Sequence, residues 1–518
     1  MVHHQRYTYN QLKKGGGDEE AGSGSGTLVL VWTNHPAYYR RRRPKLFSFL
    51  LLSLLSCTFI LAPHFFTFSH LYSFGVQNQG FSGSMDMTAP LCSSISNGTI
   101  CCDRSHFRSD ICLMKGDIRT HSPTSSVFLY SSKNGDSFTN SASSMVDDAG
   151  KEGDDELQHE KIKPYTRKWE TSVMDTINEL DLISMRLNSG VRRPCDVIHD
   201  VPAVMFSTGG YTGNVYHEFN DGIIPLYITS DQFNKRVVFV ILEYHNWWVQ
   251  KYGDILPHLS NYPPIDFNKD NQTHCFTEAI TGLRIHGELT VDPSLMNNNK
   301  SIVDFRNLLD RAYRPRVKAL VWGEQAREKM QNQAERPKLV ILSRNGSRAI
   351  TNENVLVKTA EQVGFRVRVL RPRPTTELAK IYMELNSSDA MIGVHGAAMT
   401  HLLFMRPGCS VFIQVIPLGT DWAAETYYGE PAKKLGLKYI GYKISPKESS
   451  LYDEYDKDDP VLRDPSSLNQ KGWEYTKKIY LDRQTVKLDM PRFRRRLVRA
   501  YDQITRIHRK TRLRSQLQ

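Results

Sequence analysis

Short apolar runs alternate with amphipathic stretches along most of the chain after about residue 163. The runs rich in Val, Ile, Leu and Phe cover 201–206, 236–242, 338–343, 365–370, 389–394, 410–416 and 437–444. The amphipathic stretches, with apolar positions at helical spacing, cover 352–363, 376–385 and 425–435. Strands that alternate with helices of this length are typical of βαβ units and parallel sheets. The alternation is cleanest over 338–444 and less regular over 195–330.

This pattern predicts an α/β protein with two Rossmann-like domains that face a cleft, the first at 163–334 and the second at 335–470. Nucleotides bind at the carboxyl ends of the strands in such folds. We find no internal repeat. A P-loop, a complete G-x-G-x-x-G and a G-x-S-x-G are all absent from the sequence of the two domains.

A closing helical segment is expected at 471–518. Its apolar residues recur at helical spacing: Phe493, Leu497, Tyr501, Ile504 and Ile507. Pro491 fits the first turn of this amphipathic helix. We expect the apolar stripe to pack across the first domain and the arginines to stay solvated, rather than the helix to face an acidic polysaccharide.

The first part of the chain has the pattern of a membrane anchor. Residues 46–62 carry no charge, Phe residues continue to Phe68, and Arg40–Arg43 and Lys45 precede them. This length is what a spanning helix needs, and the basic flank favours a cytoplasmic N-terminus. We expect a cytosolic tail at 1–45, a transmembrane signal anchor at 46–68 and a disordered lumenal stem with a cysteine cluster at 69–162. A buried core helix and a cleaved signal peptide are the weaker alternatives.

Cysteines and glycosylation acceptors support a lumenal location. Four of the eight cysteines lie between Cys92 and Cys112 and predict local disulfides, with an odd cysteine left over beyond the anchor. A zinc site is disfavoured because no matching C-x2-C pairs occur. The N-x-S/T acceptors expected to carry glycans are Asn97, Asn271, Asn299 and Asn386.

The net charge of +12 is concentrated at the two ends of the chain. Residues 1–45 hold eight Lys or Arg and three acidic residues, and residues 492–514 hold ten Lys or Arg against Asp502. The body is therefore near neutral. A nucleic-acid-binding surface spread over the fold is disfavoured, and no nucleic-acid partner is expected.

Two strand–turn segments have the residues for binding a diphosphate. In IGVHGAAMTH (392–401), small residues after a strand leave backbone N–H groups open to an anion, and His395 and His401 can bond a phosphate or a sugar. In LSRNGSR (342–348), Arg344 and Arg348 flank a glycine after another strand. An ordinary strand–turn–helix and a solvated loop are the plain alternatives. If the arginines line a site, Asn345 between them is unmodified.

Two further motifs carry candidate chemistry. In YHEFND (216–221), His217 and Asp221 stand one helical turn apart, so that the carboxylate either takes a hydroxyl proton or orients the histidine that does. The zinc-hydrolase motif H-E-x-x-H fails because Asp221 replaces its second histidine. In WAAETYYGE (422–430), Glu425 and the two tyrosines can meet a base or sugar, or simply pack in a core. The D-x-D at 456–458 lies in a solvated acidic run, so we expect no metal ligands there.

HEFND, LSRNGSR, GVHGAAMTH and ETYYG occur in this order after the anchor and stem. Together they resemble glycosyltransferase family 61 over about residues 195–445. The segment CDRSHFRSDICLMKGDIRTH (102–121) resembles the plant branch that decorates xylan with arabinofuranose or xylose.

The resemblance implies a GT-B-like fold, a UDP-sugar donor and inversion at the anomeric carbon. It makes Asp221 the candidate base, with His217 as the other candidate catalytic residue, the first domain the acceptor side and the second domain the nucleotide-sugar side. The candidate donor-binding residues are Arg344, Arg348, His395, Gly396, Ala397, Ala398 and Glu425. No cofactor is firmly implied, and a divalent metal is compatible but not required.

The sequence therefore predicts a single-pass type II Golgi enzyme that transfers a pentose from a UDP-sugar to xylan. One alternative is a β-1,2-xylosyltransferase of the N-glycan core or an N-acetylglucosaminyltransferase acting on protein. Another is a membrane-anchored carbohydrate-binding protein without turnover. The intact motifs favour an enzyme over the binding protein.

Overall fold

The computed structural model describes Cys92 and residues 95–131, 156–187, 193–325 and 336–516. The predicted cytosolic tail at 1–45 and signal anchor at 46–68 lie outside these residues. Within the part that is described, no helix is long and apolar enough to cross a membrane.

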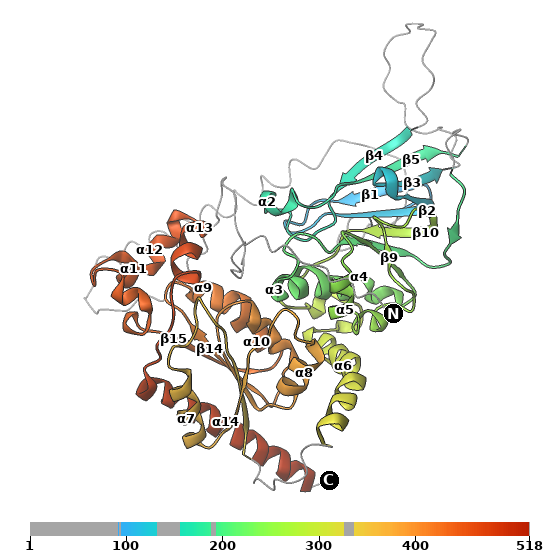
Figure 1. The fold of residues 1–518 in the computed structure, drawn as a ribbon. Coiled ribbons are helices and arrows are strands. Elements are labelled where there is room, and N and C mark those ends of the chain that lie inside the picture. Colours follow the sequence, from blue (N-terminus) through green and yellow to red (C-terminus); the bar gives the residue numbers. More distant parts are fainter. Residues whose placement is uncertain (1–91, 93–94, 132–155, 188–192, 326–335, 517–518) are drawn as a thin grey trace, which may run out of the picture. The chain divides into compact units, whose positions relative to one another are not determined.

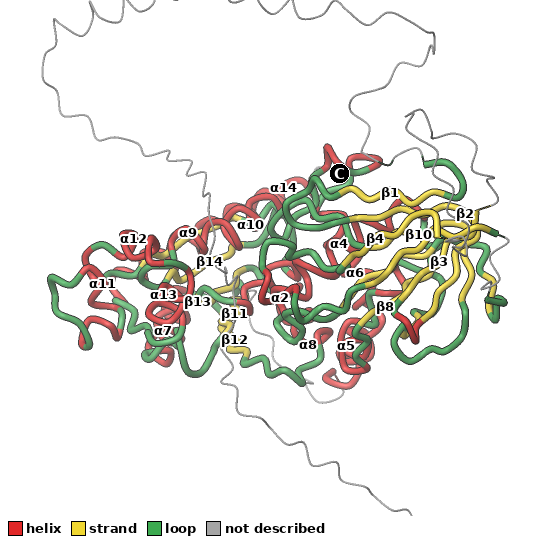
Figure 2. Tube along the Cα trace, turned by 90° about the horizontal axis from the view of Figure 1, so that it is seen from above, coloured by secondary structure: helices red, strands yellow, loops and turns green. Residues whose placement is uncertain are grey.

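Ten strands of the described residues form a mixed sheet, here called the first sheet (Figures 1 and 2). They are β1 (Thr99–Asp103), β2 (Ile111–His121), β3 (Ser126–Ser131), β4 (Glu156–Ile162), β5 (Leu180–Arg186), β6 (Val197–Ile198), β7 (Ala203–Ser207), β8 (Val238–Leu242), β9 (Ile265–Asp266) and β10 (His274–Thr281). The order is β4-β5-β3-β2-β10-β7-β8-β9, with β1 beside β2 and β6 beside β10. Strands β10, β7, β8 and β9 are parallel neighbours, whereas β2 pairs antiparallel with β1, β3 and β10. Only the parallel part matches the predicted Rossmann-like domain.

The disordered stem predicted at 69–162 is wrong for residues 99–131 and 156–162, which supply β1 to β4. The low apolar content of this region suggested disorder. Strand β4, ELQHEKI, is at the end of the sheet order, where most of its side chains are exposed, so it needs few apolar residues. Residues 132–155 of the predicted stem lie outside the described part.

Five parallel strands form the second sheet, as the apolar runs predict. They are β11 (Lys338–Leu342), β12 (Arg366–Leu370), β13 (Ala390–Val394), β14 (Val411–Ile416) and β15 (Lys438–Lys443). The order β12-β11-β13-β14-β15 places the change of winding direction between β11 and β13. Ligands of doubly wound sheets bind beyond the carboxyl ends of the strands at such a point. The LSRNGSR and GVHGAAMTH segments follow these two strands.

Helices pack against the parallel strands. The α-helices of the described residues are α2 (Thr171–Met174), α3 (Val215–His217), α4 (Ile224–Ser230), α5 (Asn246–Tyr252), α6 (Ile302–Gln325), α7 (Glu353–Val363), α8 (Leu378–Asn386), α9 (Asp421–Ala424), α10 (Glu430–Lys434), α11 (Pro460–Arg463), α12 (Pro465–Leu468), α13 (Trp473–Thr476) and α14 (Met490–Gln516). One buried cluster contains Val204 and Phe239 of the first sheet together with Val340 and Phe412 of the second. The two sheets thus share a core layer. Because both faces of the three central strands, β11, β13 and β14, are buried, these strands consist almost wholly of apolar residues, whereas β12 and β15 at the edges of the sheet carry exposed charges.

The C-terminal helix α14 packs on the second sheet's side of the molecule. Phe493, Leu497 and Ile504 are fully buried in a cluster with Leu339 and Ile413. The helix contacts α7, β14 and β15 (Figure 1). Packing of the apolar stripe is confirmed, but the predicted docking across the first domain is wrong. The outer face of the second sheet is itself apolar and needs this cover.

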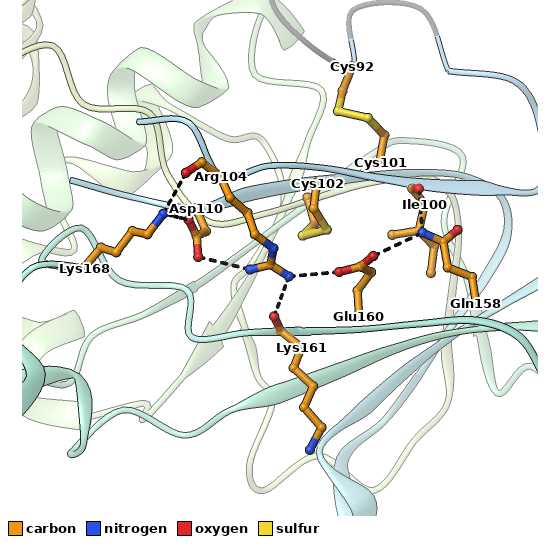
Figure 3. Close-up of a disulfide and its surroundings, with 11 residues drawn as sticks. Cys92, Ile100, Cys101, Cys102, Arg104, Asp110, Gln158, Glu160, Lys161 and Lys168 are labelled. Atoms are coloured by element: carbon orange, nitrogen blue, oxygen red, sulfur yellow. Dashed lines mark hydrogen bonds and ion pairs between the residues drawn. A yellow bond between two sulfur atoms is a disulfide. The ribbon is translucent and has the colours of Figure 1, made fainter. Parts of the chain in front are cut away.

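The described residues form three disulfides, Cys92–Cys101, Cys102–Cys112 and Cys195–Cys275. The predicted local pairing within the cysteine cluster is therefore confirmed (Figure 3). Cys409 is the one free cysteine among the described residues. The Cys102–Cys112 bond joins β1 to β2 and closes the loop 103–111 between them.

We predict that Leu497→Ala destabilises the protein by about 2–5 kcal/mol, because it leaves a cavity between α14 and the second sheet. The measurement is chemical denaturation of a fragment of about residues 75–518, which lacks the predicted anchor. Arg495→Ala, an exposed position on the same helix, is the matched control and should change little. Equal stability of the two variants would show that α14 is not part of the core.

Candidate functional site

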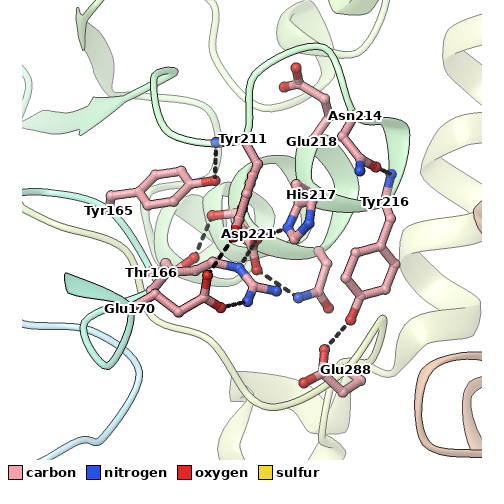
Figure 4. Close-up of polar contacts among 12 residues, drawn as sticks. Tyr165, Thr166, Glu170, Tyr211, Asn214, Tyr216, His217, Glu218, Asp221 and Glu288 are labelled. Carbon is pink, nitrogen blue, oxygen red and sulfur yellow. Dashed lines mark hydrogen bonds and ion pairs between the residues drawn. The ribbon is translucent and has the colours of Figure 1, made fainter. Parts of the chain in front are cut away.

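The HEFND motif lies in one continuous helix that changes pitch at the motif itself. Helix α3 leads into a π-helical segment, η2 (Glu218–Ile223), which continues as α4. Asn214 caps the start, its side chain accepting the N–H of Tyr216 at 3.0 Å (Figure 4). Short π-helical turns are uncommon and occur often at functional sites.

Asp221 is completely buried in an ion-pair network. Its Oδ2 accepts from Arg167 Nε at 2.8 Å and contacts His217 Nδ1 at 2.6 Å, and its Oδ1 accepts from Asn220 at 2.7 Å. Arg108 lies 4.0 Å from Oδ1. Burial would raise the pKa of Asp221, but Arg167, then His217 and Arg108, outweigh it and hold that pKa well below its usual range. Asp221 is therefore an ionised carboxylate at neutral pH.

Two more carboxylates complete the network. Glu170 pairs with Arg167, and Glu288 pairs with Arg108 at 2.8 Å. The hydroxyl of Tyr211 donates to Glu170 Oε2 at 2.8 Å. Two buried arginines are thus balanced by three carboxylates drawn from separate segments of the chain. Figure 4 labels the three carboxylates, Glu170, Asp221 and Glu288.

His217 is oriented by Asp221. Because the carboxylate can only accept, Nδ1 of His217 carries the proton, and Nε2 is the basic nitrogen of the neutral ring. The ring of Tyr211 stacks on the imidazole with centroids 4.2 Å apart. The motif alone left open whether the carboxylate or the histidine takes the proton, and the family resemblance made Asp221 the candidate base. The burial and ion pairs of Asp221 favour the histidine.

A chain of aromatic rings joins three of the motifs. Tyr216 contacts Tyr427 and Tyr428 of ETYYG at 5.5 and 5.9 Å between centroids. Tyr428 in turn contacts His395 of GVHGAAMTH at 5.4 Å. Like HEFND, ETYYG forms a π-helical segment, η8 (Glu425–Gly429), between α9 and α10. The core-packing alternative for these tyrosines thus holds, since both are buried.

The turn after β13 is held from inside the protein. Gly396 has φ +145°, a conformation that favours glycine, and it precedes the 3-10 helix η7 (Ala397–Phe404). Arg348, fully buried, donates to the carbonyl of His395 at 3.1 Å. Gln414 Nε2 lies 3.0 Å from His395 Nδ1, which therefore accepts, so this ring carries its proton on Nε2. Arg348 supports the turn rather than facing solvent.

A cavity of about 540 Å³ opens beside this turn. Its walls are the loop 210–215, residues from 372–381, Lys251 of α5, and Ala397 and Ala398 at the start of η7. Arg373 also lines it, so that two cations that the sequence analysis missed face the cavity. Ala397 and Ala398 are the predicted donor residues that line it.

The other predicted donor residues lie away from the cavity wall. Arg348 and His395 are buried, and Gly396 lies directly before Ala397. Arg344 is half-buried after β11. Glu425 forms an ion pair with Lys433 on the surface of the α9–α10 helix.

His401 lines the cavity as a neutral group. Burial lowers the pKa of His401 to about 4. Its Nδ1 donates to the carbonyl of Ala398 at 2.8 Å, which leaves Nε2 as an acceptor. This histidine can accept a bond from a sugar hydroxyl but brings no positive charge to a phosphate.

Glu218 of HEFND is a site residue that the sequence analysis did not select. Its carboxylate accepts from the N–H of Gly213 at 2.7 Å and from Trp248 Nε1. It thereby holds the loop 210–215 that forms one cavity wall. Burial raises the pKa of Glu218 to about 7, although the bonds from Gly213 and Trp248 lower it in part. No residue spacing signals this role, because the partners come from the tertiary fold.

The glycosylation acceptors differ in exposure. Asn97, Asn271 and Asn299 are exposed, whereas Asn386 is half-buried and accepts a bond from Arg306. Asn345 is exposed as well. Among the described residues, no group of three or more His, Cys, Asp or Glu side chains is placed to hold a metal ion.

Comparison with known proteins identifies related chains. The Glycosyltransferase 61 family model matches residues 216–412. The chain is 57% identical over 474 residues to the xylan glycosyltransferase MUCI21 of Arabidopsis thaliana, covering 89% of this chain and 92% of that protein. It is 37% identical to the alpha-1,3-arabinosyltransferase XAT3 of Oryza sativa subsp. japonica, covering 78% and 65% of the two chains. It is also 37% identical to the beta-1,2-xylosyltransferase XYXT1 of the same organism, covering 77% and 83%.

Glu218 gives a pH-dependent prediction. Its pKa rises from 4.5 in the unfolded chain to about 7 in the folded one, so the folded state holds the extra proton between these values. The free energy of unfolding of the wild type, relative to that of Glu218→Gln, should therefore fall as pH rises from about 4.5 to about 7 and level off above that. Thermal unfolding of both proteins across this pH range measures the difference, and parallel profiles would contradict it.

Proposed function

Because this chain belongs to glycosyltransferase family 61, we propose that it transfers a pentose, arabinofuranose or xylose, from a UDP-sugar to xylan with inversion. The proposal rests on one observation: the His217–Asp221 pair lies next to the cavity that two cations line. Tyr211 links them, since it stacks on His217 and also lines the cavity. The relatives named for xylan, arabinosyl and xylosyl transfer support the substrate class.

The cavity is the proposed donor site. The N–H groups of Ala397 and Ala398, at the start of η7, face the UDP diphosphate together with Lys251 and Arg373. Arg348 and His395 contribute by holding the Gly396 turn in place. The position of this cavity, lined by loops of both sheets, supports a GT-B-like arrangement.

Arg344 stays a proposed donor residue because it follows β11 at the winding change of the second sheet. A divalent cation accompanying the diphosphate is compatible with these roles and is not needed for them.

In the proposed reaction, His217 is the general base. Its Nε2 takes the proton of an acceptor hydroxyl as the hydroxyl oxygen bonds to the anomeric carbon and the bond to UDP breaks. Asp221 stabilises the imidazolium that forms and keeps the ring in place. The cations at the cavity stabilise the charge that grows on the leaving diphosphate.

The proposed setting is the Golgi lumen, with the enzyme held as a single-pass type II membrane protein. The uncharged run at 46–62 with its basic flank supports the anchor. The three disulfides support an oxidising compartment.

The direct test is an assay of the lumenal fragment with a panel of UDP-sugars and xylan oligosaccharides. We expect UDP release and a mass gain of one pentose per transfer. Transfer to an N-glycan or a protein acceptor, with none to xylan, would show that xylan is not the acceptor. Binding of xylan without turnover of any UDP-sugar would make the protein a carbohydrate-binding protein.

A pair of variants separates the two residues of the catalytic pair. His217→Ala should lower the transfer rate by about 10²–10⁴-fold, because the general base is lost. UDP binding, measured by calorimetry, should be unchanged, and His199→Ala, remote from the cavity, is the control. If His217→Ala transferred normally while Asp221→Asn did not, Asp221 would be the base.

A further inference from the structure

Two aromatic side chains from distant parts of the sequence form an exposed pair. Phe107 is 68% exposed and Trp169 is 37% exposed, with their ring centroids 5.8 Å apart. Phe107 belongs to the loop between β1 and β2, and Trp169 lies just before α2. Exposed apolar side chains that adjoin one another mark an interaction site more often than single exposed ones do.

The backbone that carries the two rings is firmly tied. Lys168 donates to the carbonyl of Arg104 at 2.7 Å and pairs with Asp110 at 2.6 Å (Figure 3). Arg104 pairs with Asp110 and with Glu160, each at 3.0 Å. The Cys102–Cys112 bond closes the loop that bears Phe107. The rings are therefore held in position before any ligand arrives, which lowers the entropy lost on binding.

The aromatic pair adjoins the catalytic network. The guanidinium of Arg108 lies 5.0 Å from the Trp169 ring centroid and 5.9 Å from that of Phe107. The guanidinium of Arg167 lies 5.1 Å from the Trp169 ring. Both arginines pair with Asp221, the carboxylate that orients His217. The two arginines thus lie between the exposed rings and Asp221, the carboxylate that contacts the proposed base.

The rings also adjoin the donor cavity. Glu170, next to Trp169 in the chain, accepts from the hydroxyl of Tyr211, and Tyr211 lines the cavity. An acceptor that lies on the two rings would therefore be one residue away from Glu170, which is hydrogen-bonded to the cavity wall.

We propose that Phe107 and Trp169 form an acceptor subsite that binds the flat face of a pyranose ring in a neutral polysaccharide chain. This inference rests on the proposed function. Xylopyranose carries no hydroxymethyl group, so both of its faces can lie flat against an aromatic ring. A neutral chain offers no charge to ion pairs, and the charged groups around the rings, Arg104, Asp110 and Lys168, already pair with one another.

The test measures steady-state kinetics of the lumenal fragment with xylan oligosaccharides of increasing length. The variants are Phe107→Ala, Trp169→Ala and Trp169→Phe. Leu295→Ala, which removes a 65% exposed side chain on a different element, is the matched control.

We expect each alanine variant to raise KM for long acceptors about fivefold, the loss of one ring-stacking contact. KM for the UDP-sugar should not change, and Trp169→Phe should restore most of the affinity. For the shortest acceptors, which do not reach the rings, variant and wild-type KM should agree. A variant that merely misfolds would lose activity on all acceptors.

Unchanged KM for long acceptors in Phe107→Ala and in Trp169→Ala would overturn the subsite while leaving the proposed function intact. Absence of xylan transfer by the wild type would instead overturn the proposed function. In that case the rings are still tested by binding to immobilised xylan. The affinity of His217→Ala is compared with that of the double variant His217→Ala/Phe107→Ala, and equal affinities would overturn the subsite.

Discussion

The arrangement of this molecule depends on how the negative charge of Asp221 is compensated without water. A buried carboxylate is tolerated only when cations and hydrogen-bond donors surround it. Here Arg167, Arg108, His217 and Asn220 do so, and they come from three separate stretches of the chain. Satisfying one carboxylate therefore fixes the loop after β1, the segment before α2 and the HEFND helix relative to one another.

The second sheet is joined to this network by rings rather than by charge. Tyr216 follows the capped start of the HEFND helix and meets Tyr427 and Tyr428, and Tyr428 meets His395 beside the Gly396 turn. Both HEFND and ETYYG are π-helical, which shifts the direction of side chains relative to a regular helix. The π-helical turns thus help to direct the side chains of the two motifs toward each other.

The sequence predicted those parts of the protein whose pattern is local. The second sheet was predictable because buried parallel strands are continuous apolar runs, and the His217–Asp221 contact because it spans one helical turn. Strands β1, β2 and β4 were not, since edge strands and disulfide-linked strands tolerate polar residues. The apolar run of β3 was missed because the residues around it are polar. Lys251 and Arg373 were missed because only the tertiary fold brings them to one cavity. Arg348 was predicted to face a phosphate, yet its side chain turns inward to the His395 carbonyl.

One consequence of the Cys102–Cys112 bond concerns how the enzyme becomes competent. Arg108, a cation of the Asp221 network, lies in the loop that this bond closes. Without the bond, that loop would have more conformations to lose before Arg108 could reach its buried partner. Assembly of the Asp221 network is thereby coupled to thiol oxidation. Protein produced in a reducing cytosol lacks this bond, so the choice of expression host is itself a variable of any activity measurement.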